Sequence, residues 1–264
     1  MGDARGLSCK QGAGKRGSDE DIEDVFIVGG PKAVSSAVEE SVRTLNGGTA
    51  VERVWGENRY ETALEVMGRA AGLRPAGIVF VATGKGYSDA IAASPLSYAL
   101  GAPTVLVDPA KEITAAQLEA IAASGVDHVV VLGGPAAVPN SIESQLRAAG
   151  IADVSRIAGA TRYETAVEVA RWAADNGADL SAPVVATGLK DADALAGAAL
   201  AGRSGSVLLL ADDEGAGGEA APALDFLSEH AAEVHEGYIL GGKNAISEAL
   251  ADRILAAANG VMTP

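Results

Sequence analysis

The sequence has little of several residue types on which common functions depend. Its 264 residues include one cysteine, Cys9, which excludes an intrachain disulfide framework and a cysteine-rich metal site. Aromatic residues make up 4% of the chain, so few rings are available to stack on sugars or bases. The chain has 20 basic and 35 acidic residues, and its net charge of −15 disfavours nucleic acid and anionic membrane as partners. No apolar run is long enough to span a membrane.

The most informative feature that the sequence does contain is an internal repeat. Gly-Glu-Asn-Arg-Tyr-Glu-Thr-Ala at 56–63 returns as Gly-Ala-Thr-Arg-Tyr-Glu-Thr-Ala at 159–166, which is 103 residues later. Other marks keep nearly the same spacing: Thr83-Gly84 with Thr187-Gly188, Asp89-Ala90 with Asp193-Ala194, and the Gly-Gly pairs at 29–30, 133–134 and 241–242. Such a period indicates a tandem repeat.

Short apolar runs alternate with helical patterns throughout the repeat. Runs such as 78–82 and 129–132 are apolar on both faces and are separated by helices. This pattern predicts an α/β fold in which each repeat is a small parallel sheet flanked by helices, of the Rossmann or flavodoxin-like type. The hydrophobic share of 48% is ample for such cores.

The repeat also predicts the domain organisation. Residues 1–23 are rich in Gly, Ser and charge, and we expect them to be disordered. Residues 24–52 form a partial repeat of a strand and a helix. The first full repeat then covers 53–150 and the second covers 151–260.

These marks resemble the cell wall binding repeat 2 family of Gram-positive surface proteins. The resemblance rests on Arg-Val/Ile-x-Gly-x-x-Arg-Tyr-Glu-Thr-Ala at 53–63 and 156–166, on Ala-Thr-Gly with a following Asp-Ala, and on Val-Leu-Gly-Gly-Pro-x-Ala-Val. It covers about residues 24–258. It implies tandem Rossmann-like domains, typically three in a pseudo-threefold ring, that hold surface proteins such as S-layer proteins to the wall by binding anionic secondary wall polymers.

The chain departs from the family pattern in ways that shape these expectations. It has two full copies and a fragment, no fused effector domain and no visible signal peptide. We nevertheless expect a location at the cell wall or extracellular surface, with the wall polymer and neighbouring or further repeat copies as partners. Because the chain is acidic, an anionic polymer has to be bound through local basic groups, sugar hydroxyls or a bridging divalent cation.

Arg59, Tyr60, Arg162 and Tyr163 are candidate ligand-binding residues from the repeated motif. The arginines could grip phosphate or carboxylate groups, and the tyrosines could stack on sugars. The favoured structural interpretation is that the arginines bond carbonyls or an aspartate at the domain junction, and that the tyrosine rings are packed with their hydroxyls bonded.

Asp89 and Asp193 are the remaining candidates, because each opens a helix after a turn. They are either ligand groups, partners of the repeated arginines, or helix caps, and capping is the favoured interpretation. A carboxylate there also opposes phosphate binding, and the Gly-x-Gly-x-x-Gly dinucleotide fingerprint is absent.

Catalysis has little support in the sequence. No nucleophile elbow, triad or metal-ligand spacing is evident, so we expect a protein that is not an enzyme and that uses no cofactor or metal. The acidic loop 211–220 is interpreted as solvated, with Ca²⁺ binding through Asp212, Asp213 and Glu214 as the alternative. Two other functions stay open: a Rossmann-like enzyme or nucleotide-binding protein acting on wall sugars, and a structural assembly subunit.

Overall fold

The computed structural model describes residues 24–44, 50–71 and 77–261. The segment 1–23, predicted to be disordered, and Cys9 lie outside the described residues. The predicted α/β fold is confirmed. Strands and helices alternate, and every strand pair in the described residues is parallel.

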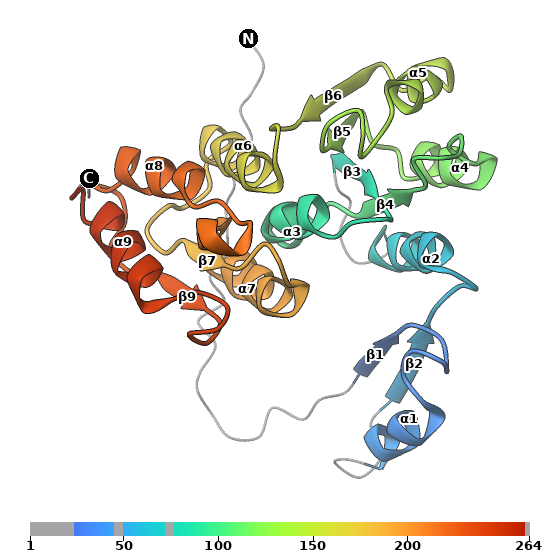
Figure 1. Cartoon of the computed structure of the whole chain (residues 1–264). Coiled ribbons are helices and arrows are strands. Elements are labelled where there is room, and N and C mark those ends of the chain that lie inside the picture. The colour runs from blue at the N-terminus through green and yellow to red at the C-terminus, as the bar shows by residue number, and fades with distance from the viewer. Residues whose placement is uncertain (1–23, 45–49, 72–76, 262–264) are drawn as a thin grey trace.

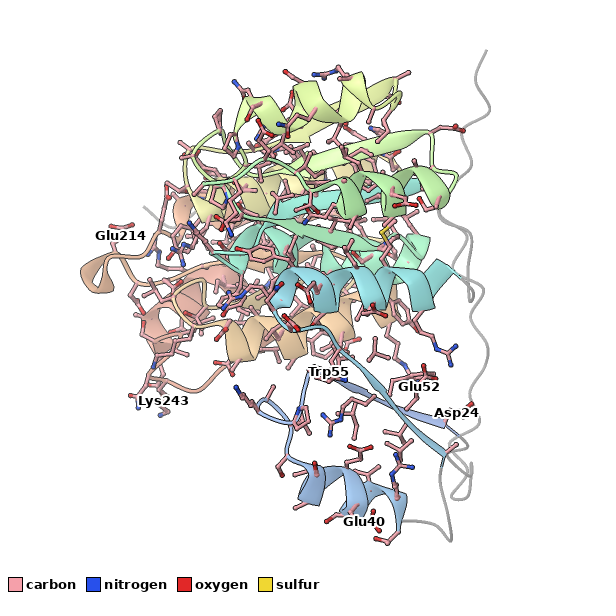
Figure 2. The ribbon with its side chains drawn as sticks, turned by 90° about the vertical axis from the view of Figure 1, so that its right-hand side faces the viewer. Asp24, Glu40, Glu52, Trp55, Glu214 and Lys243 are labelled. Atoms are coloured by element: carbon pink, nitrogen blue, oxygen red, sulfur yellow. The ribbon has the colours of Figure 1, made fainter. Side chains whose placement is uncertain are left out.

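The N-terminal unit is a two-stranded sheet with one helix. Its elements are β1 (Asp24–Val28), α1 (Ser36–Arg43) and β2 (Ala50–Val54), and Val25 of β1 is in register with Val51 of β2. Figure 1 shows this unit projecting from the rest of the molecule. Figure 2 places Asp24, Glu40 and Glu52 in it, with Trp55 close to the point where the chain enters the main body.

The first full unit contains a four-stranded sheet in the order β4-β3-β5-β6. The strands are β3 (Ile78–Thr83), β4 (Thr104–Val107), β5 (His128–Leu132) and β6 (Asp153–Ile157). The helices are α2 (Arg59–Ala71), α3 (Ser88–Leu100), α4 (Ala115–Ala123) and α5 (Asn140–Ala148). Alternate strand residues enter two cores: Phe80 and Val130 share one with Leu96 of α3, while Val79 and Val129 face Met67 of α2.

The second full unit has a three-stranded sheet in the order β8-β7-β9. The strands are β7 (Val184–Ala186), β8 (Leu208–Leu210) and β9 (Tyr238–Leu240). The helices are α6 (Arg162–Asp175), α7 (Asp191–Ser204), the short 3₁₀ helix η2 (Glu214–Ala216), α8 (Ala221–Glu229) and α9 (Glu248–Ala258). Helices α3 and α7 both end at a glycine in the left-handed region, Gly101 with φ +66° and Gly205 with φ +69°.

The N-terminal unit repeats the last part of the first full unit. Arg53 donates to the carbonyl of Gly29 at 2.6 Å and to Glu39 at 2.7 Å. Arg156, 103 residues later, donates to the carbonyl of Gly133 and to Glu143. Each arginine therefore ties a strand to the Gly-Gly turn and the helix before it.

The sheets are offset by one strand from the repeats as counted in the sequence. Strand β6 precedes the second copy of the motif but pairs with β5, so it completes the first sheet. Helix α6, which begins five residues after β6, belongs to the second unit, where it contacts β8. The motif thus connects the last strand of one sheet to the first helix of the next unit. The boundaries 53–150 and 151–260 stay predictions about the sequence period.

Helix α3 joins the two full units. It lies beside α6 and α7 (Figure 1), and its Ile91 and Ala92 share a buried cluster with Ala166, Ala194 and Ala198 of the second unit. The close approach of these helices follows from their small residues, since a Cβ on Gly202 of α7 would lie 2.8 Å from the Tyr98 Cβ.

Candidate functional site at the repeat junction

The glycine, glutamate and threonine of the repeated motif build the loop between strand and helix. Thr62 Oγ1 accepts from the Gly56 amide at 3.0 Å, and Glu61 Oε2 accepts from the Glu57 amide at 2.9 Å. A Cβ on Gly56 would lie 2.3 Å from the Glu61 Cβ, so the loop requires glycine. The second copy makes the same bonds, Gly159 to Thr165 at 3.1 Å and Ala160 to Glu164 at 2.5 Å. These residues are therefore structural.

The two motif arginines each bond a backbone carbonyl. Arg59 Nη1 donates to the Gly84 carbonyl, and Arg162 Nη1 donates to the Gly188 carbonyl, both at 2.6 Å. The predicted bonding to carbonyls is confirmed, but each carbonyl belongs to the arginine's own unit and not to a neighbouring one. Each guanidinium keeps further donors, since arginine carries five.

The motif tyrosines differ between the copies. Tyr163 is 5% exposed and donates to Asp212 Oδ2 at 3.0 Å. Burial, followed by the hydrogen bond to Asp212, raises the pKa of Tyr163 to about 12. This confirms the packed, hydroxyl-bonded interpretation for Tyr163. Tyr60 is half-buried against Gly84, where an added Cβ would lie 2.3 Å from the ring.

Asp89 and Asp193 lie in the first turns of α3 and α7, inside the helices rather than at their N-caps. The N-cap residues are Tyr87 and Lys190, and neither makes a side-chain capping bond. The capping interpretation was therefore wrong, because each helix begins earlier than the aspartate. The carboxylates instead face the Gly-Gly turns: a Cβ on Gly133 would lie 2.3 Å from Asp89, and one on Gly241 would lie 3.0 Å from Asp193.

Asp89 of α3 and Arg162 of α6 belong to different full units, and the charge of Arg162 acts on the carboxyl of Asp89 without a direct bond between them. Burial raises the pKa of Asp89, and the positive charge of Arg162 lowers it in part. No hydrogen bond or ion pair joins Arg162 to Asp89 among the described residues, so the predicted bond between a motif arginine and an aspartate stays a prediction. Arg59 and Asp193 have no such partner from a neighbouring unit among the described residues.

A cleft of about 180 Å³ lies at the same junction. It is lined by Tyr87 and Ser88 from the start of α3 and by Arg162, Gly188 and Lys190 from the second unit. Lys190 is exposed and takes part in none of the ion pairs of the described residues. Asp191 adds one carboxylate to the lining, so the titratable side chains there sum to one positive charge.

Tyr87 was not singled out from the sequence. It is 52% exposed at the cleft, and the Arg59 guanidinium lies 5.8 Å from its ring centroid. Comparison of the repeats hides it, because Asp191 stands 104 residues later in its place. Tyr87 could have been noticed because the chain has few aromatic residues and this one lies in the turn just before a repeated aspartate.

The interpretation of the acidic loop as solvated was wrong for Asp212. This residue is 1% exposed and accepts from the Tyr163 hydroxyl, from the Thr187 hydroxyl and from the Gly188 amide. Asp213 accepts from Ser247 at 2.7 Å, which holds the loop to the start of α9. In the described part of the chain, no group of three or more His, Cys, Asp or Glu residues is placed to hold a metal ion.

The fold and the junction define a class: tandem α/β repeats linked by a strand-to-helix motif and packed through an α3-type helix. The chain belongs to the Cell wall binding domain 2 (CWB2) family, whose model matches residues 53–143 and 156–251. Membership supports a cell-wall-binding role and a location at the wall or cell surface. Among the described residues, no helix has the length and apolar character needed to cross a membrane.

Two curated proteins of Bacillus subtilis (strain 168) are similar to this chain. The N-acetylmuramoyl-L-alanine amidase LytC is 31% identical over 192 residues, covering 73% of this chain and 36% of LytC. The amidase enhancer is 28% identical over 187 residues, covering 71% of this chain and 24% of the enhancer. The chain thus spans about a third and a quarter of these relatives.

Solved structures show the same architecture. Cwp8 from Clostridium difficile superposes with a TM-score of 0.76 at 25% identity, over 93% of this chain and 40% of that one. Cwp6 from the same organism superposes with a TM-score of 0.66 at 23% identity, over 77% of this chain and 31% of that one.

Proposed function

We propose that this chain is a non-catalytic module that anchors to the cell wall by binding an anionic secondary wall polymer at the junction cleft. The observation that carries the proposal is the grouping of Arg162 and Lys190 beside the exposed ring of Tyr87. In a chain with a net charge of −15, a local excess of positive charge next to an aromatic face is unusual and suits an acidic glycan.

The cleft offers two complementary kinds of contact. Lys190 supplies a mobile ammonium group, and Arg162 retains donors after bonding the Gly188 carbonyl, so both can bind phosphate or carboxylate. The Tyr87 ring supplies an apolar face on which a sugar ring can stack. The family's wall-binding role supports this assignment, and no catalytic step is needed for it.

A pull-down with purified Gram-positive walls tests the proposal. Intact walls should retain the chain, and walls stripped of their anionic polymer should not. Lys190→Gln and Tyr87→Ala should each weaken retention roughly 10-fold, which is what the loss of one charged or stacking contact of about 1.4 kcal/mol produces. Raising the salt concentration should weaken binding further, because charge pairing in the cleft is partly exposed.

Lys243→Gln is the matched control. Lys243 is an exposed lysine paired with Glu248 at 2.5 Å, and Figure 2 shows it at the edge of the molecule, apart from Trp55 and the N-terminal unit. This change removes the same charge without touching the cleft, so retention should stay at the wild-type level. Equal binding to stripped and intact walls would contradict polymer recognition, whereas an equal loss in the Lys190 and Lys243 variants would contradict the assignment to the cleft.

A further inference from the structure

Two lysines of the first full unit lie against one carboxylate at the carboxyl ends of β3 and β4. Lys85 Nζ is 3.0 Å from Asp108 Oδ1, and Lys111 Nζ is 4.0 Å from Asp108 Oδ2. The lysine side chains are 56% and 73% exposed, whereas that of Asp108 is 17% exposed. This lysine pair therefore presents two ammonium groups to solvent above one largely covered carboxylate, which leaves an excess of one positive charge.

The fold of the repeat does not require the lysine pair. The positions 104 residues later hold Leu189 and Gly215, which carry no charge. The turn after the strand is nevertheless the same in both units. The Lys85 amide donates to Thr83 Oγ1 at 3.1 Å, and the second unit repeats this bond from Leu189 to Thr187 at 3.2 Å. The ammonium groups are thus a feature of the first unit alone, and they are available to a ligand.

Arg59 and Tyr87 connect the lysine pair to the junction cleft. Tyr87 lines the cleft, and its exposed ring lies with its centroid 5.8 Å from the Arg59 guanidinium. Arg59 in turn donates to the carbonyl of Gly84, the residue before Lys85, at 2.6 Å, and it keeps further donors after that bond. An anionic chain that leaves the cleft past Tyr87 therefore meets Arg59 first and the lysine pair next.

We propose that Lys85 and Lys111 form a second anion subsite, and that one polymer chain runs from the junction cleft past Tyr87 to this subsite. The ligand class is a polyanion with acidic groups on successive units, because each cluster of cations needs an anionic group of its own. Binding of one chain at both clusters raises the affinity without stronger individual contacts. This inference rests on the proposed polymer binding, but neither lysine lines the cleft, so the two can be tested separately.

Calorimetric titration with inorganic polyphosphate at about 0.1 M salt tests the subsite without cell walls, at a Debye length of about 10 Å. Long-chain polyphosphate can reach both clusters, so the double variant Lys85→Gln/Lys111→Gln should bind it about 10-fold more weakly than the wild type. Tripolyphosphate is expected to occupy one cluster at a time. The wild type should therefore bind two molecules of it, and the double variant should bind one.

Two further variants serve as controls. Lys243→Gln removes an exposed lysine paired with Glu248 and should leave polyphosphate binding at the wild-type level. Lys85→Arg/Lys111→Arg keeps both charges and should restore binding. Both lysines are exposed, so the thermal unfolding of the double variants should match that of the wild type. Wild-type affinity for long-chain polyphosphate in the glutamine double variant, or an equal loss in Lys243→Gln, would overturn the proposal.

Retention on cell walls separates this inference from the proposed function. The glutamine double variant should lose about 10-fold of its retention on intact walls and should behave like the wild type on walls stripped of anionic polymer. Polymer-dependent retention that the double variant keeps in full would overturn this inference and leave the proposed function intact. A wild type that stripped walls retain equally well would overturn the proposed function and the polymer path together, whatever the lysine pair does with polyphosphate.

Discussion

The two full repeats hold equivalent aspartates in different ways. Asp212 turns inward, where it accepts from Tyr163 at 3.0 Å and from the Gly188 amide at 2.6 Å. Asp108, 104 residues earlier, lies at the surface and bonds Lys85 and the Ala110 amide, each at 3.0 Å. The Ala110 amide, followed by Lys85, holds the pKa of Asp108 below its usual value.

The surroundings of the two aspartates differ: the Gly84 amide bonds the Val107 carbonyl, whereas the Gly188 amide bonds the Asp212 carboxylate. Lys85 offers Asp108 a cation at the surface, whereas the equivalent position in the second repeat is Leu189, which offers none. The Asp212 carboxylate bonds inward to Tyr163 and Thr187. The second copy therefore has a buried polar network where the first has an ion pair with Lys85, and the two should differ in energy.

Replacing the two aspartates by alanine should show the largest contrast. Asp212→Ala leaves the Tyr163 and Thr187 hydroxyls and the Gly188 amide without their acceptor, and should lower the free energy of unfolding by about 3 kcal/mol. Asp108→Ala removes an exposed pair and should cost less than about 1 kcal/mol. Urea titration of both variants measures the difference, and equal losses would show that the inward network adds nothing.

Changing the tyrosines should have a smaller effect that depends on pH. Tyr163→Phe removes one bond to a carboxylate and should cost about 1.5 kcal/mol at neutral pH. Because the folded pKa of Tyr163 is about 12, above the usual value near 10, the native state binds its proton more tightly. Wild-type stability should therefore fall as pH rises from about 10 to about 12, and Tyr163→Phe should lack this part of the decline.

The control for that measurement is Tyr60→Phe. Tyr60 is half-buried, and none of the described hydrogen bonds involves its hydroxyl, so its loss should cost less than about 0.5 kcal/mol and leave the alkaline decline unchanged. An alkaline transition that is identical in wild type and Tyr163→Phe would remove Tyr163 as its cause.

The smallest expected effect concerns Asp89. Burial raises its pKa, so the ionised form is penalised in the native state despite the nearby Arg162. Asp89→Asn should be slightly more stable than wild type at pH 7. The native state binds the Asp89 proton more tightly than the unfolded chain does, so wild-type stability should rise on acidification and close the gap. Thermal melts at two pH values measure this, and a less stable variant at pH 7 would mean that attraction to Arg162 dominates.

The sequence was sufficient to predict the fold class but not where each sheet begins and ends. Apolar runs such as 129–132 predicted parallel strands, and the repeat predicted similar units. A tandem repeat has a period but no marked start, so nothing in the sequence showed that β6 completes the sheet before the motif. Which sheet β6 joins depends on the strand against which it packs in the folded chain, and the sequence period does not specify this.

The part of the candidate site that could be predicted is the bonding of the arginines in the repeated motif. Carbonyl bonding by Arg59 and Arg162 was expected at the domain junction, because paired arginines are a common interface device, but each carbonyl belongs to the arginine's own unit. The burial of Asp212 was not, because an acidic, glycine-rich loop has the composition of a solvated one. Its inward turn depends on Tyr163, which lies 49 positions away in the chain. The position of Tyr87 at the cleft was likewise hidden, because it depends on contact between units rather than on spacing.

The loop at Gly159 has a mechanical consequence. It leaves β6 of one sheet and enters α6 of the next unit within a few residues, and the side chains of Glu164 and Thr165 fold back to bond its amides. The covalent connection between the units is therefore short and held by hydrogen bonds, so it is a rigid connection rather than a flexible linker. A Cβ on Gly159 would lie 2.2 Å from the Glu164 Cβ, so a larger residue there would force the loop to open. One glycine in each repeat thus lets the connection between strand and helix stay this short.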